Sequence, residues 1–593
     1  MTNSTGIELV VDGESVVVED ATGTLLGLLR DQLRIVEVKD GCSPQGQCGC
    51  CTVLVDGQPR VACVTPVRRV AGRSVTTAAG LSPERRQRWA RAFTDAGASQ
   101  CGFCTPGIIV RLDALDTKLG PAVSGSVGSG SVGSGSAGSG PVTSIRLESA
   151  QPGATAGATA GAISAASGEE SEVEGRAAGG RPEGAMVDQA LLAHLCRCTG
   201  WQTIVEAWER FRSDADPTPD GAGGTETGVV VNIGVDRRPD QAARRAELEG
   251  GAPQRVGPEV AFGHGGFSVD EAPADALVAV SNGQGGWSVG QTLAEARALM
   301  GKVQGRRTTA DHQWPLAVPE GDWGARLRTT WVEPAYLETD ASWCLPGGEP
   351  STVVANGGAF GAKAESPVRA AARAMADEHG RPVVALASRE DATRWGAKRP
   401  PVAGGANADG SGLLRVVATP GIAEAVASIA PGLLVEQVQA PGPPTSGAVR
   451  AAGWAEAVAL LAGARGSLTP VTAPNGAVAE AEVIDGVIRA HVRCGALLDE
   501  VVLRSYCIGA AHMAWSLVTS EALTVDSDGV VHDLTIRSFG VARAVDTPRI
   551  EISLDPADQG EPVNGSDAVF AAVAAATWLS FGCRQDWPVG VQR

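Results

Sequence analysis

Short alternations of apolar and polar residues open the chain and predict β structure. Residues 7 to 18, IELVVDGESVVV, form two β-branched runs separated by Asp12-Gly13, the pattern of a hairpin. Leucines recur at helical spacing over 24 to 33 and predict a helix with one apolar face. A second hairpin is predicted over 51 to 63, CTVLVDGQPRVAC, around Asp56-Gly57. These elements predict a small mixed sheet that grips a helix.

Helical periodicity follows. In LSPERRQRWARAFTDAG, Ser82 is a candidate N-cap, Pro83 suits the first helical position, and Trp89 and Phe93 lie one turn apart. Two more apolar helices are predicted for IIVRLDAL and QTIVEAWERF. Beyond residue 228, short β-like runs alternate with Ala-rich helices, which predicts a large mixed α/β region. The fold class expected for the whole chain is α+β and multidomain.

Two low-complexity tracts suggest where the domains end. Residues 119–186 are rich in Gly, Ser, Ala and Glu and bury too little apolar surface to offset ordering entropy, so this insert is predicted to be disordered. Residues 213–228 read as a linker. The expected domains are therefore 1–81, 82–212 with the insert, and 229–593.

Composition and charge narrow the function classes. The 593 residues exceed one core, and two to four domains is the usual number for this length. A net charge of −18 argues against nucleic acid and anionic membrane surfaces as partners. We find no apolar run expected to span a membrane and no export signal in MTNSTGIELVVDG. In the cytoplasmic location this predicts, the thirteen cysteines favour metal ligation over disulfides.

The stretch GCSPQGQCGCC, residues 41 to 51, concentrates four cysteines on one loop. A [2Fe–2S] cluster needs four thiolates, and Cys42, Cys48, Cys51 and Cys63 are the predicted set. Glycines at 41, 46 and 49 allow backbone amides to turn toward sulfur. Cys50 is expected to be a spare thiol. The first gap has five residues where plant-type spacing has four, which we interpret as one extra loop residue; a zinc site or inert thiols are the alternatives.

A second set of cysteines is predicted from two pairs near helix starts. Cys101 and Cys104 precede IIVRLDAL, and Cys196 and Cys198 precede QTIVEAWERF. A zinc knuckle is the rival interpretation. Cys-x-Cys is unusual for zinc, and helix N-termini suit an anionic cluster, so the pattern favours a second [2Fe–2S] centre.

The motifs GQCGCCTVLVDGQPRVAC, QCGFCTPGI and LCRCTGW resemble the two-cluster module of the molybdenum hydroxylases, which include xanthine dehydrogenase, aldehyde oxidase and aerobic carbon monoxide dehydrogenase. The resemblance covers residues 1 to about 212, apart from the insert. It implies a β-grasp, ferredoxin-like domain with an exposed cluster and a helical domain with a buried one. It also implies that Gln100 and Cys198 approach the pterin of a molybdenum cofactor.

The later sequence resembles the molybdenum-binding part of that family more weakly. NGGAFGAK, residues 356 to 363, is similar to the loop that lays Gly358, Phe360 and Gly361 against the metal. VRAAGWAEA implies that Arg450 faces substrate. Where relatives carry Gly-Glu, this chain reads Gly565-Ser566-Asp567, so Asp567 would be a stand-in base. The region is also roughly half the expected length.

The resemblance implies an oxidoreductase that oxidises a small-molecule substrate, an aldehyde or N-heterocycle, and passes electrons through two [2Fe–2S] clusters. No flavin-binding segment is seen, so FAD would belong to a separate subunit or another acceptor would serve. The alternative is a decayed electron-transfer or binding subunit that keeps the clusters without molybdenum chemistry. His512 is expected to be a core histidine, and Cys344, Cys494, Cys507 and Cys583 are expected to be buried as small hydrophobes.

Overall fold

A computed structural model describes residues 6–19, 21–120, 182–213, 237–301, 312–352, 358–556 and 559–590. Most of the predicted disordered insert and of the predicted linker lies outside these residues. The edges of the insert prediction need correction, because Leu119 ends one helix and residues 182–186 begin another. The proline at 182 stands at a helix start, a position that suits its fixed φ.

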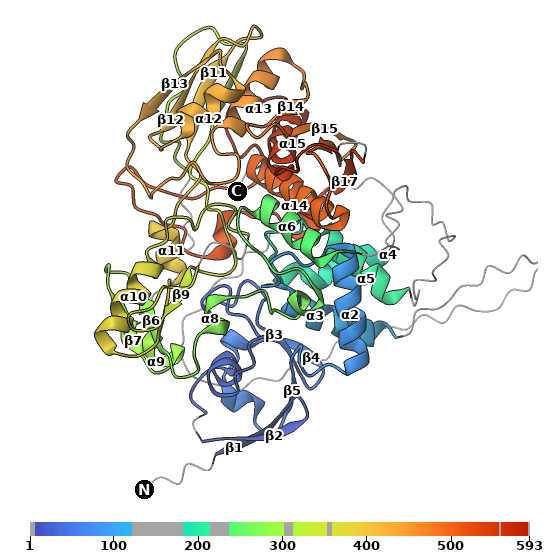
Figure 1. Cartoon of the computed structure of the whole chain (residues 1–593), viewed down its shortest axis with the longest axis vertical. Helices are drawn as coiled ribbons and strands as arrows, with labels where there is room; N and C mark the ends of the chain where they lie inside the picture. The colour runs from blue at the N-terminus through green and yellow to red at the C-terminus, as the bar shows by residue number, and fades with distance from the viewer. Residues whose placement is uncertain are drawn as a thin grey trace, which may run out of the picture. The chain divides into compact units, whose positions relative to one another are not determined.

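The N-terminal residues form a five-stranded sheet in the order β2-β1-β5-β3-β4 (Figure 1). Its strands are β1 (Ile7–Val11), β2 (Glu14–Val18), β3 (Thr52–Val55), β4 (Gln58–Val61) and β5 (Ser74–Thr76). Both predicted hairpins are confirmed, with antiparallel pairing of β1 with β2 and of β3 with β4. The central pair, β1 and β5, is parallel.

The predicted leucine helix packs into this sheet. It consists of α1 (Leu25–Gly27) and a π-helical turn over Leu28–Gln32, and its first turn is capped by the Thr24 hydroxyl, which accepts from Gly27 N. Leu25, Leu28 and Leu29 are almost fully buried. The mixed sheet that grips a helix is therefore confirmed, and short 3₁₀ turns follow at Ala62–Val64 and Val67–Val70.

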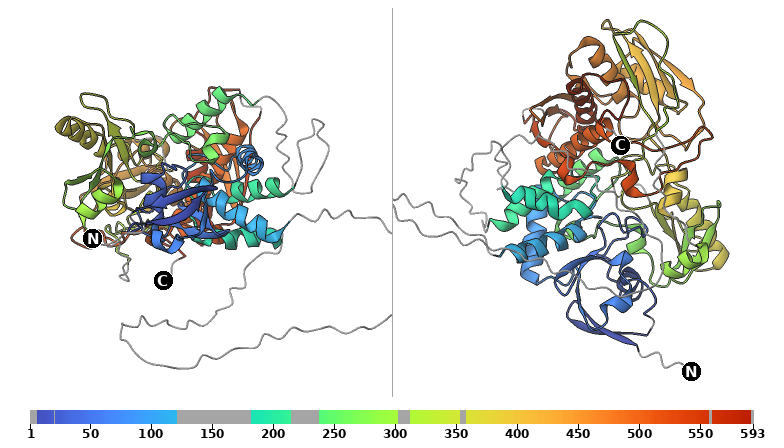
Figure 2. Two further views of the ribbon diagram at one scale, coloured as in Figure 1. Left: turned by 90° about the horizontal axis from the view of Figure 1, so that it is seen from below. Right: turned by 180° about the vertical axis from the view of Figure 1, so that it is seen from behind.

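Four helices follow: α2 (Pro83–Ala96), α3 (Thr105–Leu119), α4 (Pro182–Ala190) and α5 (Gln202–Arg212). Helix α3 packs on β3 and β4 of the sheet, while α2 packs on α5 and α4 on α3 (Figures 1 and 2). Ser82 caps α2 as predicted, with its hydroxyl accepting from Arg85 N at 3.3 Å. Trp89 of α2 stacks on Phe211 of α5 with ring centroids 3.6 Å apart. This aromatic contact fixes α5, and so the cysteines that precede it, against the first helices.

The C-terminal described residues contain three further four-stranded mixed sheets, ordered β7-β6-β10-β9, β13-β12-β11-β8 and β14-β15-β16-β17. Their strands are β6 (Leu277–Ser281), β7 (Trp287–Gly290), β8 (Ala325–Arg328), β9 (Ala341–Cys344), β10 (Val383–Leu386), β11 (Val402–Ala406), β12 (Gly412–Val417), β13 (Leu433–Val438), β14 (Val471–Thr472), β15 (Val478–Ile484), β16 (Val487–Arg493) and β17 (Arg549–Leu554).

Helices cover these sheets and confirm the predicted mixed α/β region: α9 packs on β6 and β7, α10 on β9 and β10, α13 on β8 and β11, and α15 on β15 and β16. The helices are α6 (Pro239–Gly250), α7 (Pro258–Ala261), α8 (Ser268–Glu271), α9 (Leu293–Met300), α10 (Val368–His379), α11 (Arg389–Trp395), α12 (Ile422–Ile429), α13 (Trp454–Arg465), α14 (Glu500–Thr519) and α15 (Ser566–Ser580), with 3₁₀ turns at Leu191–Ala193, Ile536–Phe539 and Ala544–Asp546.

Helix α14 is long and apolar enough to cross a membrane by length and composition, which the sequence reading had missed. In the structure, however, 83% of its apolar window is buried inside the protein, where it packs against α15 and β17. The apolar residues of α14 are therefore those of a core helix.

Three of the four isolated cysteines, Cys344, Cys494 and Cys507, are buried as predicted, whereas Cys583 is only half-buried. His512, on α14, is fully buried and its Nε2 lies 3.2 Å from the Ala542 carbonyl oxygen. Burial, to which the charge of Arg197 adds, lowers the pKa of His512 to about 4. The prediction of a core histidine is confirmed.

We expect this histidine to make the chain acid-sensitive. The folded chain keeps His512 neutral while the unfolded chain protonates it near pH 6.5, so stability is lost as pH falls from 6.5 toward 4. Between pH 8 and pH 5 the loss from this group should be about 2 kcal/mol. Comparing urea unfolding of wild type and His512→Gln, which keeps a donor for Ala542, measures it. Equal pH dependence in both proteins would contradict the expectation.

Candidate iron–sulfur centres and adjoining site

The first predicted cysteine set is assembled by the N-terminal sheet. Cys42, Cys48 and Cys51 lie on the loop that leads into β3, and Cys63 follows β4. The β3–β4 hairpin thus returns Cys63 to the loop. Side-chain hydrogen bonds join Cys42 to Cys48 and Cys63, and Cys51 to Cys63. These contacts connect all four thiols, and a side-chain hydrogen bond between Cys48 and Cys50 brings the predicted spare thiol to the same place. None of the five forms a disulfide.

Backbone amides of the loop point at sulfur, as the glycine pattern predicted. Gln45 N lies 3.2 Å and Gln47 N 3.4 Å from Cys42 Sγ, and Cys63 N lies 3.4 Å from Cys51 Sγ. Gly46 and Gly49 have positive φ, at 73° and 74°, which few other residues adopt. Gly41 serves differently, because a Cβ there would lie 3.0 Å from both Cys48 Sγ and Cys50 Sγ. Such amide donors stabilise thiolate charge.

The implied exposure of the first set is not what the structure shows. The four thiol residues are only 0–3% exposed, compared with 1–7% for the second set. The reason is that residues of the C-terminal region cover the loop: Gln45 Nε2 donates to Glu390 Oε1 at 3.0 Å and to the Leu534 carbonyl at 2.9 Å. Both cysteine sets are therefore interior.

The second set comes together across the insert. Cys101 Sγ lies 3.6 Å from Cys198 Sγ, and a side-chain hydrogen bond joins Cys104 to Cys196. Two thiolates on one tetrahedral metal, at metal–sulfur distances of about 2.3 Å, lie roughly 3.7 Å apart. Within the described residues, no three histidine, cysteine or carboxylate side chains converge on one metal-sized point. The second set therefore lies as two thiol pairs, Cys101 with Cys198 and Cys104 with Cys196.

Hydrogen bonding prepares one thiol of each set for ionisation. A hydrogen bond from Cys104, helped by Thr199, lowers the pKa of Cys196 to about 6. Hydrogen bonds from Cys48 and Cys63 hold the pKa of Cys42 well below its usual range, against the opposing effect of burial. Because metals bind thiolates, these environments suit ligation.

The two cysteine loops touch each other. Leu195 N donates to the Cys48 carbonyl oxygen at 3.0 Å. Because Leu195 precedes Cys196, this hydrogen bond joins the two cysteine loops directly. The start of α3 packs on the same loop, since a Cβ at Gly107 would lie 2.5 Å from Gly49 O. Cys50 is 1% exposed; the charge of Cys101 raises the pKa of Cys50, and the charge of Cys50 raises that of Cys104. It lies between the sets.

Arg197, between Cys196 and Cys198, ties the second loop to the C-terminal region. Its guanidinium makes a bidentate pair with Glu521 at 2.6 and 2.9 Å and donates to the Pro334 carbonyl at 2.9 Å. Both side chains are at most 5% exposed. The sequence reading did not single out Arg197, because its partner is 324 positions away.

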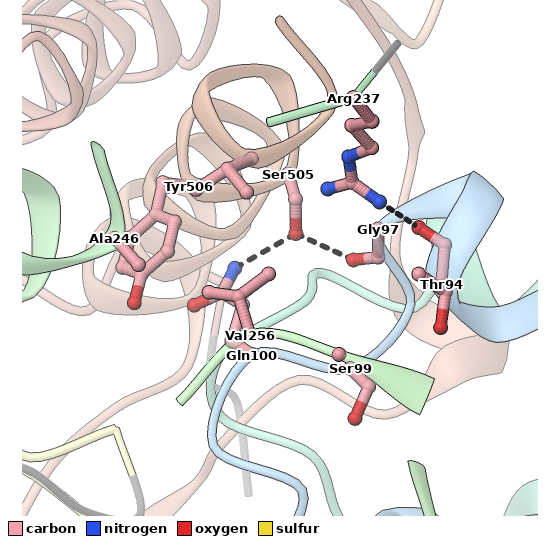
Figure 3. A pocket seen from close by; sticks show the side chains of 11 residues that line it. Thr94, Gly97, Ser99, Gln100, Arg237, Ala246, Val256, Ser505 and Tyr506 are labelled. Carbon is pink, nitrogen blue, oxygen red and sulfur yellow. Dashed lines mark hydrogen bonds between the residues drawn. The ribbon is translucent and has the colours of Figure 1, made fainter. Parts of the chain in front are cut away.

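Gln100 and Cys198, implied to approach a pterin, are neighbours. Gln100 Nε2 donates to the Cys198 carbonyl at 2.9 Å and to Ser505 Oγ at 3.0 Å, and Ser505 in turn donates to Gly97 O (Figure 3). Gln100 Oε1 and the Tyr506 hydroxyl are buried and have no hydrogen-bond partner among the residues that the structure describes. A Cβ at Gly358 would lie 3.1 Å from Cys198 Sγ, which brings the glycine loop to the same place.

The other residues implied for a molybdenum site are in contact with one another. Arg450 Nε lies 3.0 Å from Asp567 Oδ1, and its guanidinium stacks 3.6 Å from the centroid of Phe360. Arg450 also donates to Ser566 Oγ at 2.9 Å, and its side chain is 1% exposed. Gly361 has φ of 92° and lies against Ala448, where a Cβ would meet the carbonyl oxygen.

Little space remains around these residues. The cavity lined by Gln100, Cys198, Gly358 and Phe360 measures about 10 Å³, and the one over Phe360 and Arg450 about 20 Å³. Each holds roughly one water molecule, whereas small-molecule sites have volumes of about 300–1,000 Å³. The described residues therefore do not fit a pterin cofactor in this conformation, although Gln100 Oε1 and Tyr506 offer polar groups to one.

Comparison with known proteins agrees with these motifs. The [2Fe-2S] binding domain family matches residues 77–124. Aldehyde oxidoreductase from Megalodesulfovibrio gigas is 45% identical over 106 residues, 17% of this chain but only 12% of that protein. The nicotinate dehydrogenase small FeS subunit of Eubacterium barkeri is 33% identical over 135 residues, 21% of this chain and 85% of that subunit.

The architecture is also shared. The solved aldehyde oxidoreductase from Desulfovibrio gigas matches with a TM-score of 0.60 over 96% of this chain and 97% of that one. At 14% identity this likeness concerns the fold alone. The cysteine motifs and the match to most of a small iron–sulfur subunit carry the family assignment, and the chain therefore belongs to the molybdenum hydroxylase family of iron–sulfur oxidoreductases.

Proposed function

We propose that this chain is the electron-carrying component of an oxidoreductase. Cys101, Cys104, Cys196 and Cys198 would hold one [2Fe–2S] cluster next to Gln100, and Cys42, Cys48, Cys51 and Cys63 would hold a second. When bound, the two clusters would supply a path for electrons from the Gln100–Cys198 end to the first cysteine loop. The observation that carries the proposal is the 3.0 Å hydrogen bond from Leu195 N to Cys48 O. It joins the two cysteine loops within the protein interior.

The residues support this path in three ways. The eight thiols are buried, which keeps water from them, and none of them forms a disulfide. Amide donors at Cys42 and Cys51 stabilise thiolate charge. Arg197 and Glu521 fix the Cys196–Cys198 loop, so little reorganisation accompanies a change in charge. When bound, the clusters would supply reversible one-electron transfer, which no side chain of the chain provides.

The final acceptor is proposed to be a separate partner, such as an FAD-containing subunit, and no FAD is proposed in this chain. The source of electrons is proposed to be a small-molecule substrate that is oxidised outside this chain. The described residues leave only about 10 Å³ beside Cys198, which does not fit a molybdenum cofactor in this chain. A cytoplasmic location is proposed from the thirteen cysteines and the absence of disulfides among those described.

A second candidate keeps substrate oxidation at molybdenum within this chain. The observation in its favour is the pair of unpartnered buried groups, Gln100 Oε1 and the Tyr506 hydroxyl, beside Cys198. Arg450 would then face an aldehyde or N-heterocycle and Asp567 would be the base. This requires their 3.0 Å ion pair to open, because a paired and buried arginine presents no free donor fork to a substrate.

Elemental analysis separates the two candidates. We expect the purified full chain to contain about four iron atoms per chain, because two [2Fe–2S] clusters hold two irons each, and no stoichiometric molybdenum. Molybdenum at about one atom per chain would instead support the second candidate. Zinc in place of iron, from protein grown with adequate iron, would contradict the proposal.

A further inference from the structure

The loop that carries Cys42 and Cys48 is held from outside by the C-terminal region. Arg297 donates to Asp40 and Ser43, at 2.6 and 2.8 Å. All polar groups of the Gln45 side chain are engaged, with Glu390 Oε1, Leu534 O and, at 3.3 Å, Ile536 N. These partners lie 254 to 491 positions away in the sequence. They come from α9, α11 and the turn at 536–539.

Two further arginines of the C-terminal region, Arg389 and Arg537, bring positive charge to the loop. Arg389 is fully buried, and its guanidinium donates to the carbonyl of Gly41 at 2.6 Å and to those of Tyr336 and Leu337. Among the described residues, its hydrogen bonds all go to carbonyl oxygens. A buried cation held only by carbonyls is costly unless negative charge lies nearby. Gly41 is the residue before Cys42.

Arg537 approaches the other end of the loop. Its Nε donates to Gln47 O at 2.8 Å and its NH2 to Leu192 O at 2.8 Å, while Arg537 N donates to Gln47 Oε1 at 3.3 Å. Gln47 is the residue before Cys48. Burial lowers the pKa of Arg537, and the charges of Cys48 and Cys42 act in the opposite direction. The guanidinium therefore lies within the electric field of the first thiol set.

These contacts have an electrostatic consequence for the first cluster. Two ferric ions and two sulfides balanced against four thiolates leave a net negative charge, and reduction adds one electron. We propose that Arg389 and Arg537 are positioning residues of the C-terminal region that stabilise this charge and raise the reduction potential of the first cluster. The inference rests on the proposed function, because it assumes a cluster on Cys42, Cys48, Cys51 and Cys63.

The neighbouring acids do not cancel this effect. Asp40 is paired with Arg297 at 2.6 Å, so that pair is neutral as a unit. Glu390 is the one carboxylate that contacts the loop through Gln45, and it adds negative charge next to Arg389. Asp340 is a further buried carboxylate near Arg389, since both act on Tyr336. Among the described residues the hydrogen bonds of the Arg537 guanidinium go to carbonyl oxygens and not to a carboxylate, so its positive charge is the less compensated of the two. The charges also predict opposite effects for removing Arg537 and for removing Glu390.

The test is an anaerobic redox titration of the full chain, with dithionite as electron donor and paramagnetic resonance as the readout of each cluster. Arg537→Met should make the first cluster about tenfold harder to reduce, a negative shift of about 59 mV for one electron. Arg537→Lys keeps the charge and should recover at least half of that shift. Glu390→Gln, measured at pH 8, should shift the same potential in the positive direction.

Arg111→Met is the matched control. Arg111 is also half-buried, and its Nε donates to Ala190 O at 2.8 Å, two residues before the Leu192 carbonyl that Arg537 contacts. Among the described residues, its side-chain hydrogen bond does not reach residues 40–47. It should leave the first potential unchanged. Shifts of the same sign for Arg537→Met and Glu390→Gln, or no shift in either, would overturn the inference.

Loss of a cluster and an unchanged potential test different parts of the proposal. If Arg537→Met does not retain iron, the Glu390→Gln variant tests the inference instead: a positive shift of the first-cluster potential supports it, and a negative shift or no shift overturns it. If the wild-type chain itself shows no signal from a [2Fe–2S] cluster, the proposed function fails, and not merely the tuning by Arg389 and Arg537. If the first cluster is present and both variants have the same first-cluster potential as wild type, the proposed function stands and only the tuning fails.

Discussion

Replacing Cys48 by serine should abolish one of two [2Fe–2S] signals in the reduced full chain and leave the other. Cys48 is fully buried and its thiol is hydrogen-bonded to Cys42, within the set completed by Cys51 and Cys63. A serine oxygen is a harder and poorer ligand for iron than a thiolate. The second set shares no cysteine with the first, so its signal should persist. Paramagnetic resonance with iron analysis measures both.

Cys50→Ser is the matched control for this experiment. Cys50 is as buried as Cys48 and its thiol contacts Cys48, yet it is the extra cysteine of the loop. Both signals should survive its replacement. Loss of a signal in Cys50→Ser together with retention in Cys48→Ser would mean that the ligand assignment on this loop is wrong.

Arg197→Met should lower the free energy of unfolding by about 3–5 kcal/mol, the usual cost of removing one partner from a buried ion pair. The substitution leaves Glu521 charged, 1% exposed and without its bidentate partner. It also frees the Cys196–Cys198 loop, so the second cluster should be lost first on denaturation. Urea unfolding, followed by the visible absorption of the clusters, measures both effects.

Arg504→Met provides the comparison, because Arg504 makes a bidentate pair with Glu206 at 2.7 and 2.8 Å on a partly exposed surface. Such a pair contributes at most about 1 kcal/mol. Replacing both Arg197 and Glu521 by apolar residues should recover part of the loss. An Arg197→Met protein as stable as wild type would show that this buried pair does not hold the loop.

Local patterns predicted the N-terminal part of the fold well. The Asp-Gly turns marked both hairpins, and Ser82-Pro83 marked the start of α2. These signals succeed because turn and cap geometry depends on a few neighbouring residues. The cysteine spacing predicted that Cys42, Cys51 and Cys63 come together, as they do, but not that Cys50 contacts Cys48, so the choice of ligands on this loop stays a prediction.

Contacts between distant segments could not be predicted in this way. The exposure of the first loop was predicted wrongly because its cover, Glu390 and Leu534, lies about 345 and 489 positions away. Arg389 and Arg537 carry no motif that marks their role. Their function follows from what they contact, and periodicity contains no information about that.

The residues expected at a molybdenum site show a related limit. Phe360, Arg450 and Asp567 were each inferred separately from weak resemblances. The structure brings them together, but in contact with each other, with Arg450 stacked on Phe360 and paired with Asp567. Spacing predicts which residues share a neighbourhood, whereas the packing decides whether the space between them is open.

Because residues of the C-terminal region cover the first cysteine loop, the order of synthesis limits when iron can reach its thiols. Cys42 to Cys63 emerge from the ribosome long before Arg537, the last of the arginines that hold this loop. At about 5–20 residues per second, synthesis from Cys63 to Arg537 takes roughly 25–95 seconds. Iron delivery is easiest in that interval, while the thiols can still be reached. Chains completed under iron starvation should close over empty cysteines and recover cluster slowly when iron returns.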